Sequence, residues 1–361
     1  MTAPRPFIAP VVLPHVACEP GCPLCPPEDG PDARPVPPPA PSPDLIPAAV
    51  ERALARSGGR PVELAFYGGD LWSLDRGPRT LLLDAAEAEV RRKRVEGIRL
   101  SLTPRSVLRA PLGELKARGV RAVEVALFTV HAETLLDLGL GRTSRVGLGA
   151  LGRLHRARLR SIAVLMPGLP SSSHGSAITT TEAVARARVD GVRLLPALAL
   201  GGTRLGDRFR RGDWMPMRLD EAVTTCKDQV RILREAGVPV LRVGLQPDQD
   251  LWEAPPVLAG PAHPSLRSRV EGELLRRRAT AALTSVWRFG IRAVTFVVHP
   301  REESWLRGHE NRTIRHLQER FRLDEVRILP LDEQPSGRVR AFPGLLDAEG
   351  IPPLRGARRA S

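Results

Sequence analysis

Strand-like and helix-like segments alternate along most of the sequence, and this alternation limits the folds that the chain can adopt. Strands that take turns with helices form parallel sheets, and the helices pack outside the sheet. Six or more such units predict a full or partial (β/α) barrel, with its chemistry at the carboxyl ends of the strands. The expected strands cover residues 7–13, 62–67, 98–102, 122–128, 161–166, 192–197 and 240–245.

The expected helices lie between these strands. They cover residues 44–56, 81–93, 106–118, 148–159, 179–188 and 219–236. In the last of them, Leu219, Val223, Cys226, Val230 and Leu233 form one apolar stripe at helical spacing. We therefore expect Cys226 to be a small buried core residue and not a metal ligand.

Composition divides the chain into a large core and a small second domain. Residues 1–246 are expected to form the core, in which the proline-dense segment 26–43 forms a loop. Residues 247–264 have the composition of a linker, and residues 265–340 contain a basic helix and further strand and helix signals. Residues 341–361 are expected to be a basic, disordered tail.

The net charge of +14 has two interpretations. A basic surface can bind nucleic acid by releasing counterions. Alternatively, the excess of arginine, proline and glycine reflects a GC-rich coding sequence. Aromatic residues are only 4% of the chain, with a single tyrosine, which is a small supply for stacking on bases. The first apolar run is too short for a secretory signal, so we expect a cytoplasmic protein with no membrane contact.

Three of the 4 cysteines lie close together, in the spacing C-x3-C-x2-C directly after the first expected strand. Cys18, Cys22 and Cys25 could hold three irons of a 4Fe-4S cluster and leave the fourth iron open. A zinc site normally has four ligands, and His15 would have to complete it. A loop disulfide with one spare thiol is the third alternative.

A second motif, Tyr67-Gly68-Gly69-Asp70, follows the second expected strand. Two glycines at the end of a strand let the backbone approach a ligand closely. The carboxylate of Asp70 could then accept an amino group. A tight turn between strand and helix is the alternative interpretation.

Longer runs along the chain resemble one known family. They are FIAPVVLPHVACEPGCPLC, ELAFYGGDLWSL, AVEVALFTVHAETL, VLMPGLPSS, GDWMPMRLDEAV and LRVGLQ. On these runs the chain resembles radical S-adenosylmethionine (SAM) proteins of the Elongator catalytic subunit-like group, which are related to oxygen-independent coproporphyrinogen oxidases. The resemblance covers about residues 7–273 and is weaker to about residue 340. No acetyltransferase domain follows in this sequence, unlike in full-length Elongator subunits.

The resemblance implies a fold and a set of site residues. The fold is an α/β partial (β/α) barrel, the radical SAM core, with a small C-terminal α/β domain. Cys18, Cys22 and Cys25 would ligate the 4Fe-4S cluster. The residues implied to contact S-adenosyl-L-methionine are Gly68, Gly69, Asp70, Glu124, Arg142, Met166, Pro167, Gly168, Leu195 and Pro196.

Two of these residues have open alternatives. Glu124, expected at the end of the fourth strand, binds the ribose or amino group of SAM or forms a strand-end salt bridge. Arg142 contacts the SAM carboxylate or a substrate phosphate, or is a solvated arginine. The residue that performs catalysis is not identified by the sequence.

The implied activity is reductive cleavage of SAM to a 5'-deoxyadenosyl radical that abstracts hydrogen from a tRNA base or a small metabolite. Such an enzyme needs an external electron donor of the flavodoxin or ferredoxin type, and tRNA is a candidate partner. The alternative is a non-catalytic Fe-S or RNA-binding accessory protein derived from that family.

Overall fold

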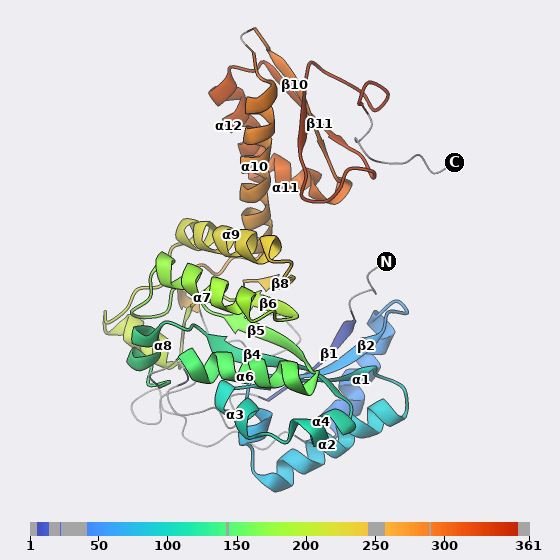
Figure 1. Ribbon diagram of the computed structural model, residues 1–361, viewed down its shortest axis with the longest axis vertical. Helices are drawn as coiled ribbons and strands as arrows, with labels where there is room; N and C mark the ends of the chain where they lie inside the picture. The colour runs from blue at the N-terminus through green and yellow to red at the C-terminus, as the bar shows by residue number, and fades with distance from the viewer. Residues whose placement is uncertain are drawn as a thin grey trace. The chain divides into compact units, whose positions relative to one another are not determined.

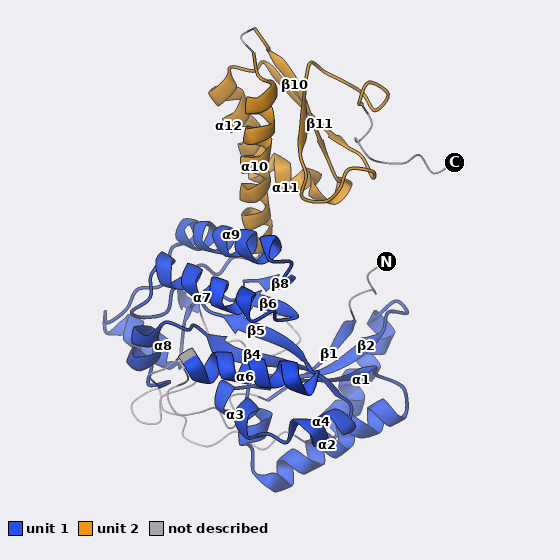
Figure 2. Ribbon diagram, viewed as in Figure 1, with its two compact units in different colours: residues 1–264 blue, residues 265–361 orange. Residues whose placement is uncertain are grey.

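The chain divides into two compact units, Met1–Pro264 and Ser265–Ser361 (Figure 2). The computed structural model describes residues 6–13, 22, 42–141, 144–244, 257–288 and 290–352. Most of the predicted proline-dense loop, residues 26–41, therefore lies outside the described residues.

The first unit is built on a curled, parallel sheet of seven strands (Figure 1). The strand order is β1-β2-β3-β4-β5-β6-β8, so each strand pairs with the next long strand of the sequence and β1 and β8 form the two edges. This is the open half-barrel that alternating strands and helices predict, and the predicted α/β partial barrel is confirmed. The strands are β1 (Phe7–Val12), β2 (Val62–Tyr67), β3 (Gly97–Leu102), β4 (Val120–Phe128), β5 (Arg160–Leu165), β6 (Gly191–Leu194) and β8 (Val240–Val243).

Helices connect these strands and pack on the outer face of the sheet (Figure 1). Their buried residues are mainly apolar, and with the apolar side chains of the strands they form the core of the unit. The helices are α1 (Leu45–Arg56), α2 (Arg76–Arg91), α3 (Pro104–Arg109), α4 (Leu112–Ala117), α5 (Ala132–Asp137), α6 (Ser144–Ala157), α7 (His174–Arg186), α8 (Arg204–Arg210) and α9 (Leu219–Glu235), with a short 3-10 helix η1 (Leu71–Ser73).

The structure differs from the sequence-based expectation in three places. The helix expected over residues 106–118 is two helices, because Pro111 interrupts it. The short helices α5 and α8 were not predicted. Part of the predicted linker is a strand, since β9 (Val257–Ala259) pairs antiparallel with β7 (Ala199–Leu200).

Helix α9 confirms the prediction for Cys226. The side chains of Cys226, Val230 and Leu233 are fully buried on its inner face. Burial raises the pKa of the Cys226 thiol to about 12. Cys226 is therefore a core residue that stays protonated near neutral pH.

The second unit is a small α/β domain around a three-stranded sheet of order β11-β10-β12. β10 pairs parallel with β11 and antiparallel with β12. Phe296, Leu306 and Leu317 are among the buried side chains of its core. β12 contains residues 340–343, so the sequence-based boundary at residue 340 was wrong, and the domain extends into the segment expected to be a tail. The elements are α10 (Leu266–Val286), β10 (Ala293–Val298), η2 (Pro300–Glu302), α11 (Glu303–Arg307), η3 (His309–Asn311), α12 (Arg312–Phe321), β11 (Glu325–Pro330) and β12 (Arg340–Pro343).

Among the described residues, none of the helices combines the length and the apolar character that a membrane-spanning segment requires.

Candidate functional site

The Tyr67–Asp70 turn and the end of β1 meet at the carboxyl edge of the sheet. The backbone N–H of Leu13, just past β1, donates to the carbonyl oxygen of Tyr67 at 2.6 Å. Gly68 has φ +84°, and a Cβ atom there would lie 3.0 Å from the Leu13 carbonyl oxygen. Only glycine fits such a close approach without strain. The cysteine segment follows Leu13 in the sequence.

Asp70 is buried, and its carboxylate is bonded to the protein's own backbone. Oδ1 accepts a hydrogen bond from the N–H of Trp72 and Oδ2 accepts one from the N–H of Thr103, each at 3.0 Å. The side chain thereby caps η1 and joins the ends of β2 and β3. This contact set matches the turn interpretation. A contact between Asp70 and the amino group of SAM stays a prediction.

The sequence-predicted residues after β5 and β6 lie at the same edge of the sheet. Their backbone groups bond to neighbouring strands: the N–H of Met166 donates to Phe128 O, and Pro167 O accepts from the N–H of Ala197, both at 2.9 Å. Gly168 O accepts from the indole N–H of Trp214 at 3.2 Å.

Leu195 and Pro196 follow β6 directly. The N–H of Leu195 donates to Leu165 O at 2.8 Å, and Pro196 is buried. The structure therefore brings these residues together, and their contacts with SAM stay predictions.

Several predicted residues lie outside the described residues, namely His15, Cys18, Cys25 and Arg142. Cys22 is described and partly buried. Within the described part of the chain there is no group of three or more His, Cys, Asp or Glu side chains that could hold a metal ion. The turn at Gly68 brings backbone close to Leu13, the last described residue before the cysteine segment in the sequence.

The concave face of the sheet carries a buried network of charged side chains. Arg99 Nη1 donates to Glu124 Oε1 at 2.9 Å, and its Nη2 donates to Glu63. Arg193 Nη1 donates to Glu124 Oε2 at 2.7 Å, and Arg160 donates to Glu63. Both glutamate side chains are only 2% exposed. Buried carboxylates are stable only when they are paired in this way.

Glu124 lies within β4, four residues after its first residue and four before its last, and not at the carboxyl end of the strand. The predicted position was therefore wrong, and the salt-bridge alternative describes its contacts in the structure. The irregular register of β3 and β4 near Arg99 puts Glu124 opposite Ser101. The inner face of this strand therefore points a carboxylate at Arg99 and Arg193.

Tyr67 joins this network from β2. Its hydroxyl donates to Glu124 Oε1 at 3.3 Å, and the Arg193 guanidinium lies 5.2 Å from the ring centroid. Burial, and then the charge of Glu124, raise the pKa of Tyr67 to about 12. Burial lowers the pKa of Arg99, but the interactions of Arg99 with Tyr67, Glu63 and Glu124 raise it by more. The pKa of Arg99 therefore lies above its ordinary value. Near neutral pH the phenol is therefore a neutral hydrogen-bond donor and the arginine a fixed cation.

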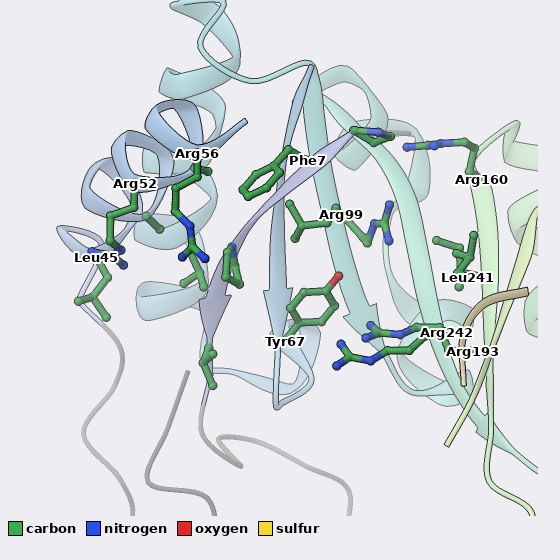
Figure 3. Close-up of a pocket in the computed structure, with 18 of the residues that line it drawn as sticks. Phe7, Leu45, Arg52, Arg56, Tyr67, Arg99, Arg160, Arg193, Leu241 and Arg242 are labelled. Carbon is green, nitrogen blue, oxygen red and sulfur yellow. The ribbon is translucent and has the colours of Figure 1, made fainter. Parts of the chain in front are cut away.

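A cavity of about 580 Å³ opens on this concave face (Figure 3). Its walls come from β1, α1 and the inner faces of β2, β3, β5, β6 and β8. Tyr67 stands in its middle, with arginines on either side (Figure 3). The arginines that line the cavity are Arg52, Arg56, Arg99, Arg160, Arg193 and Arg242.

Sequence reasoning missed this cavity, although the sequence contains a signal for it. Five of the seven expected strands have a single charged residue within an apolar run: Glu63, Arg99, Glu124, Arg193 and Arg242. In a sheet whose strands are buried on both faces, such residues must share the inner face and neutralise one another. Only Glu124 was singled out from the sequence.

Two comparisons with known proteins match part of the sequence. Residues 189–276 match the Radical_SAM C-terminal domain family. An uncharacterized Bacillus subtilis protein, YtqA, is 26% identical over 122 residues, which are 34% of this chain and 38% of YtqA.

Among solved structures, Elp3 of the archaeon Methanocaldococcus infernus, with an N-terminal deletion, is similar with a TM-score of 0.57 and 17% identity. The match covers 75% of this chain and 63% of that one. The Escherichia coli coproporphyrinogen III oxidase HemN, described as a radical SAM enzyme, has a TM-score of 0.45 at 17% identity, over 64% of this chain and 53% of HemN. The chain thus spans less than two thirds of the length of each of these relatives, and the Elp3 match is a likeness of fold.

Proposed function

We propose that this chain, a member of the radical SAM superfamily, is an enzyme that binds a 4Fe-4S cluster through Cys18, Cys22 and Cys25 and uses S-adenosyl-L-methionine to remove a hydrogen atom from its substrate. The substrate is a tRNA base or a small metabolite. The observation that carries the proposal is the geometry at the carboxyl edge of the half-barrel, where Leu13, the last described residue before the cysteine segment in the sequence, meets the Gly68 turn.

When bound, the cluster and SAM supply a 5'-deoxyadenosyl radical, after transfer of one electron from an external donor of the flavodoxin or ferredoxin type. The chain's own residues provide the surroundings. The apolar residues Met166, Leu169 and Trp214 form a buried cluster beside the edge and keep water away from it. Gly68, which is exposed, leaves backbone accessible beside Leu13.

The inner-face network supplies a fixed electrostatic environment below this edge. Arg99 and Arg193 hold the Glu124 carboxylate in two hydrogen bonds, and Tyr67 stays protonated beside it. Such preorganised groups need no rearrangement when a substrate binds. They can therefore orient a polar substrate.

The first experiment measures cluster binding. Anaerobic reconstitution should give about four irons per chain, as one 4Fe-4S cluster requires. The variant Cys18→Ala/Cys22→Ala/Cys25→Ala should bind none of it, whereas Cys226→Ala, which removes the buried fourth cysteine, should keep the full iron content. Iron retained by the triple variant, or stoichiometric zinc in the wild type, would overturn the cluster assignment.

The second experiment measures SAM cleavage. Reduced, reconstituted protein should convert SAM to 5'-deoxyadenosine, and the triple cysteine variant should not. Addition of the true substrate should raise the rate, so bulk tRNA and a pool of small metabolites are tested in parallel. Protein that binds the cluster but does not cleave SAM would contradict the proposed enzymatic activity.

That last outcome would favour the second candidate, a non-catalytic Fe-S or RNA-binding accessory protein. One observation favours this candidate. The carboxylate of Asp70, expected to contact SAM, already accepts hydrogen bonds from Trp72 and Thr103. An accessory protein would bind the cluster and give no 5'-deoxyadenosine.

A further inference from the structure

A strained turn ends strand β4 at the carboxyl edge of the sheet. Phe128 has φ +58°, a backbone conformation that is unfavourable for a bulky side chain. The carbonyl oxygen of Leu127 accepts a hydrogen bond from the N–H of Thr129 at 2.7 Å, which closes a three-residue turn around Phe128. The register of β4 against β5 also shifts just before Phe128. Such a conformation persists only where the surrounding structure holds it.

Two buried threonines hold this turn, Thr129 within it and Thr180 on α7. Their Oγ1 atoms lie 3.1 Å apart. Thr180 Oγ1 also accepts a hydrogen bond from the N–H of Val130 at 3.2 Å, and Thr129 Oγ1 accepts one from the N–H of His131 at 3.0 Å. Only one of the two hydroxyl hydrogens can lie between the two oxygens. The other hydroxyl has no acceptor among the described residues, so the pair keeps one unused donor.

Gln229 of α9 has an unused acceptor. It is 1% exposed, and its Nε2 donates to Thr181 Oγ1 at 2.9 Å. That hydroxyl in turn donates to the carbonyl oxygen of Ala177 at 2.8 Å, so it can only accept from Gln229, and the other amide atom is the oxygen. Oε1 is buried and has no hydrogen-bond partner in the described part of the chain. A buried acceptor without a donor is costly, and it marks a place where a donor belongs.

A small cavity has both the unused donor and the unused acceptor in its lining. Its volume is about 10 Å³, and a single water molecule requires roughly 10–15 Å³. A buried water also needs at least two polar partners. The threonine pair offers the donor, and Gln229 offers the acceptor. The residues that line the cavity include Phe128, Thr129, Met166, Pro167, Thr180 and Gln229.

We propose that this cavity binds one internal water molecule, which accepts a hydrogen bond from the Thr129–Thr180 pair and donates one to Gln229 Oε1, and that Gln229 acts through it as a positioning residue. A water-mediated bridge is nearly as favourable in enthalpy as a direct hydrogen bond. It joins α9 to the threonines that hold the Phe128 turn. The turn in its place fixes Met166, whose N–H donates to Phe128 O at 2.9 Å. The water site stands on the cavity and its lining alone. Its consequence for SAM binding rests on the proposed function, in which Met166 is expected to contact SAM.

A crystal structure of the full chain tests the water site without any substitution. Electron density for one water is expected within hydrogen-bond distance of Gln229 Oε1 and of the Oγ1 atom of Thr129 or Thr180. A well-defined map of this region without a water at Gln229 Oε1 would overturn the proposal. This measurement also covers the case in which a variant of Gln229 fails to fold.

Amide hydrogen exchange of the full chain tests the positioning role. Gln229→Met removes the acceptor and keeps a side chain of similar length, so the N–H groups of Val130 and Met166 should exchange roughly tenfold faster. Thr181→Val is the matched control, because it removes the other hydrogen bond of the same amide and leaves Oε1 in place. It should leave both exchange rates near those of the wild type, with the N–H of Ile98, on β3, as the reference for overall stability. Equal acceleration in the two variants would make Gln229 an ordinary core residue and overturn the positioning role.

The final comparison separates this inference from the proposed function. Calorimetry on reconstituted protein should give a SAM affinity roughly tenfold lower for Gln229→Met than for the wild type at equal iron content, and an unchanged affinity for Thr181→Val. Equal SAM affinities of Gln229→Met and the wild type would overturn the positioning role. A wild type that binds no SAM would reject the proposed function, and the crystal structure and the exchange rates would still decide on the water and on Gln229.

Discussion

Tyr67 couples the carboxyl edge of the half-barrel to the charged network below it. It is the last residue of β2, directly before the Gly68 turn, and its hydroxyl donates to Glu124. It is also the single tyrosine of the chain, so its ionisation can be observed without interference from other phenols. One residue therefore reports on the electrostatics of the whole cavity.

The phenol should titrate near pH 12 in the folded protein, against the ordinary value of 10.0. Because the folded pKa is raised, the stabilisation is complete below pH 10 and is lost as the pH rises from about 10 to about 12. Two pKa units correspond to roughly 2–3 kcal/mol of unfolding free energy. Ultraviolet absorbance of the phenolate measures this directly, with denatured protein and Tyr67→Phe as references. A phenol that titrates near 10 in the folded chain would contradict the buried contact with Glu124.

Asp70 makes a second residue-scale prediction. Its carboxylate caps η1 and accepts from Thr103, so Asp70→Ala should lower the unfolding free energy by about 1–3 kcal/mol. Asp75→Ala is the matched control, because Asp75 precedes α2 without a side-chain capping bond. Chemical denaturation of both variants makes the comparison. Equal stability of the two variants would show that the Asp70 carboxylate is not a structural cap, and a loss of SAM affinity in stable Asp70→Ala protein would restore its predicted ligand role.

At the scale of elements, hydrophobic runs and helical periods predicted the long strands and most helices of the half-barrel. Apolar runs such as residues 62–67 clearly indicate strands, because a strand covered on both faces needs nearly continuous apolar side chains. Because these runs are apolar on both faces, the sequence did not reveal which side chains share the inner face. Glu63 and Arg99 look like isolated charged residues in the sequence, and only the register of adjacent strands brings them together. Short elements such as α5 have too few residues for a periodic signal.

The site at the carboxyl edge of the sheet was also predicted only in part, because some of its features depend on contacts between residues far apart in the sequence. The motif at Gly68 was found because glycine pairs after a strand have a conformational meaning that sequence preserves. The cavity was not predicted, because it is formed by side chains of six strands and α1 that are distant in sequence. The prediction for Asp70 shows what sequence cannot reveal. Its carboxylate accepts hydrogen bonds from Trp72 and Thr103, and a contact with Thr103, 33 residues away, is not visible in the sequence.

The turn between β2 and η1 gives a prediction for an element. Gly68→Ala must accept φ +84° and place Cβ 3.0 Å from the Leu13 carbonyl oxygen. Gly59→Ala provides the control, since Gly59 has φ +78° but nothing within 4 Å of its Cβ position. The left-handed conformation alone costs roughly 1–2 kcal/mol, so Gly59→Ala should lose about that much and Gly68→Ala more. Denaturant titration of both variants measures the difference. Equal losses would mean that the ends of β1 and β2 do not approach so closely.

For the whole molecule, several of the basic side chains are paired with carboxylates, which leaves the net charge of +14 unchanged but affects where it acts. Arg91, the last residue of α2, bonds to Glu87, and Arg92, directly after the helix, bonds to Glu89. Arg276 of the second unit bonds to Glu273. Surface pairs of this kind contribute little to stability, but they reduce the positive potential available to a phosphate backbone.

The arginines after β7 lead to the last prediction, which concerns tRNA. Arg208 holds Asp137 through two hydrogen bonds of 2.9 and 3.2 Å, Arg210 pairs with Asp207, and Arg211 pairs with Asp213. The contact with Arg208 also lowers the pKa of Asp137, so that pair persists at mildly acidic pH. Because each guanidinium already faces a carboxylate, Arg208→Ala/Arg210→Ala/Arg211→Ala should change tRNA affinity by less than about threefold, a few tenths of a kcal/mol. Filter binding of tRNA at two salt concentrations measures this, and a phosphate contact would add a slope of roughly −0.7 in log K against log salt. A loss of tenfold or more in the triple variant, with a shallower salt slope, would mean that these arginines leave their aspartates for phosphates, and it would favour tRNA over a small metabolite as the substrate.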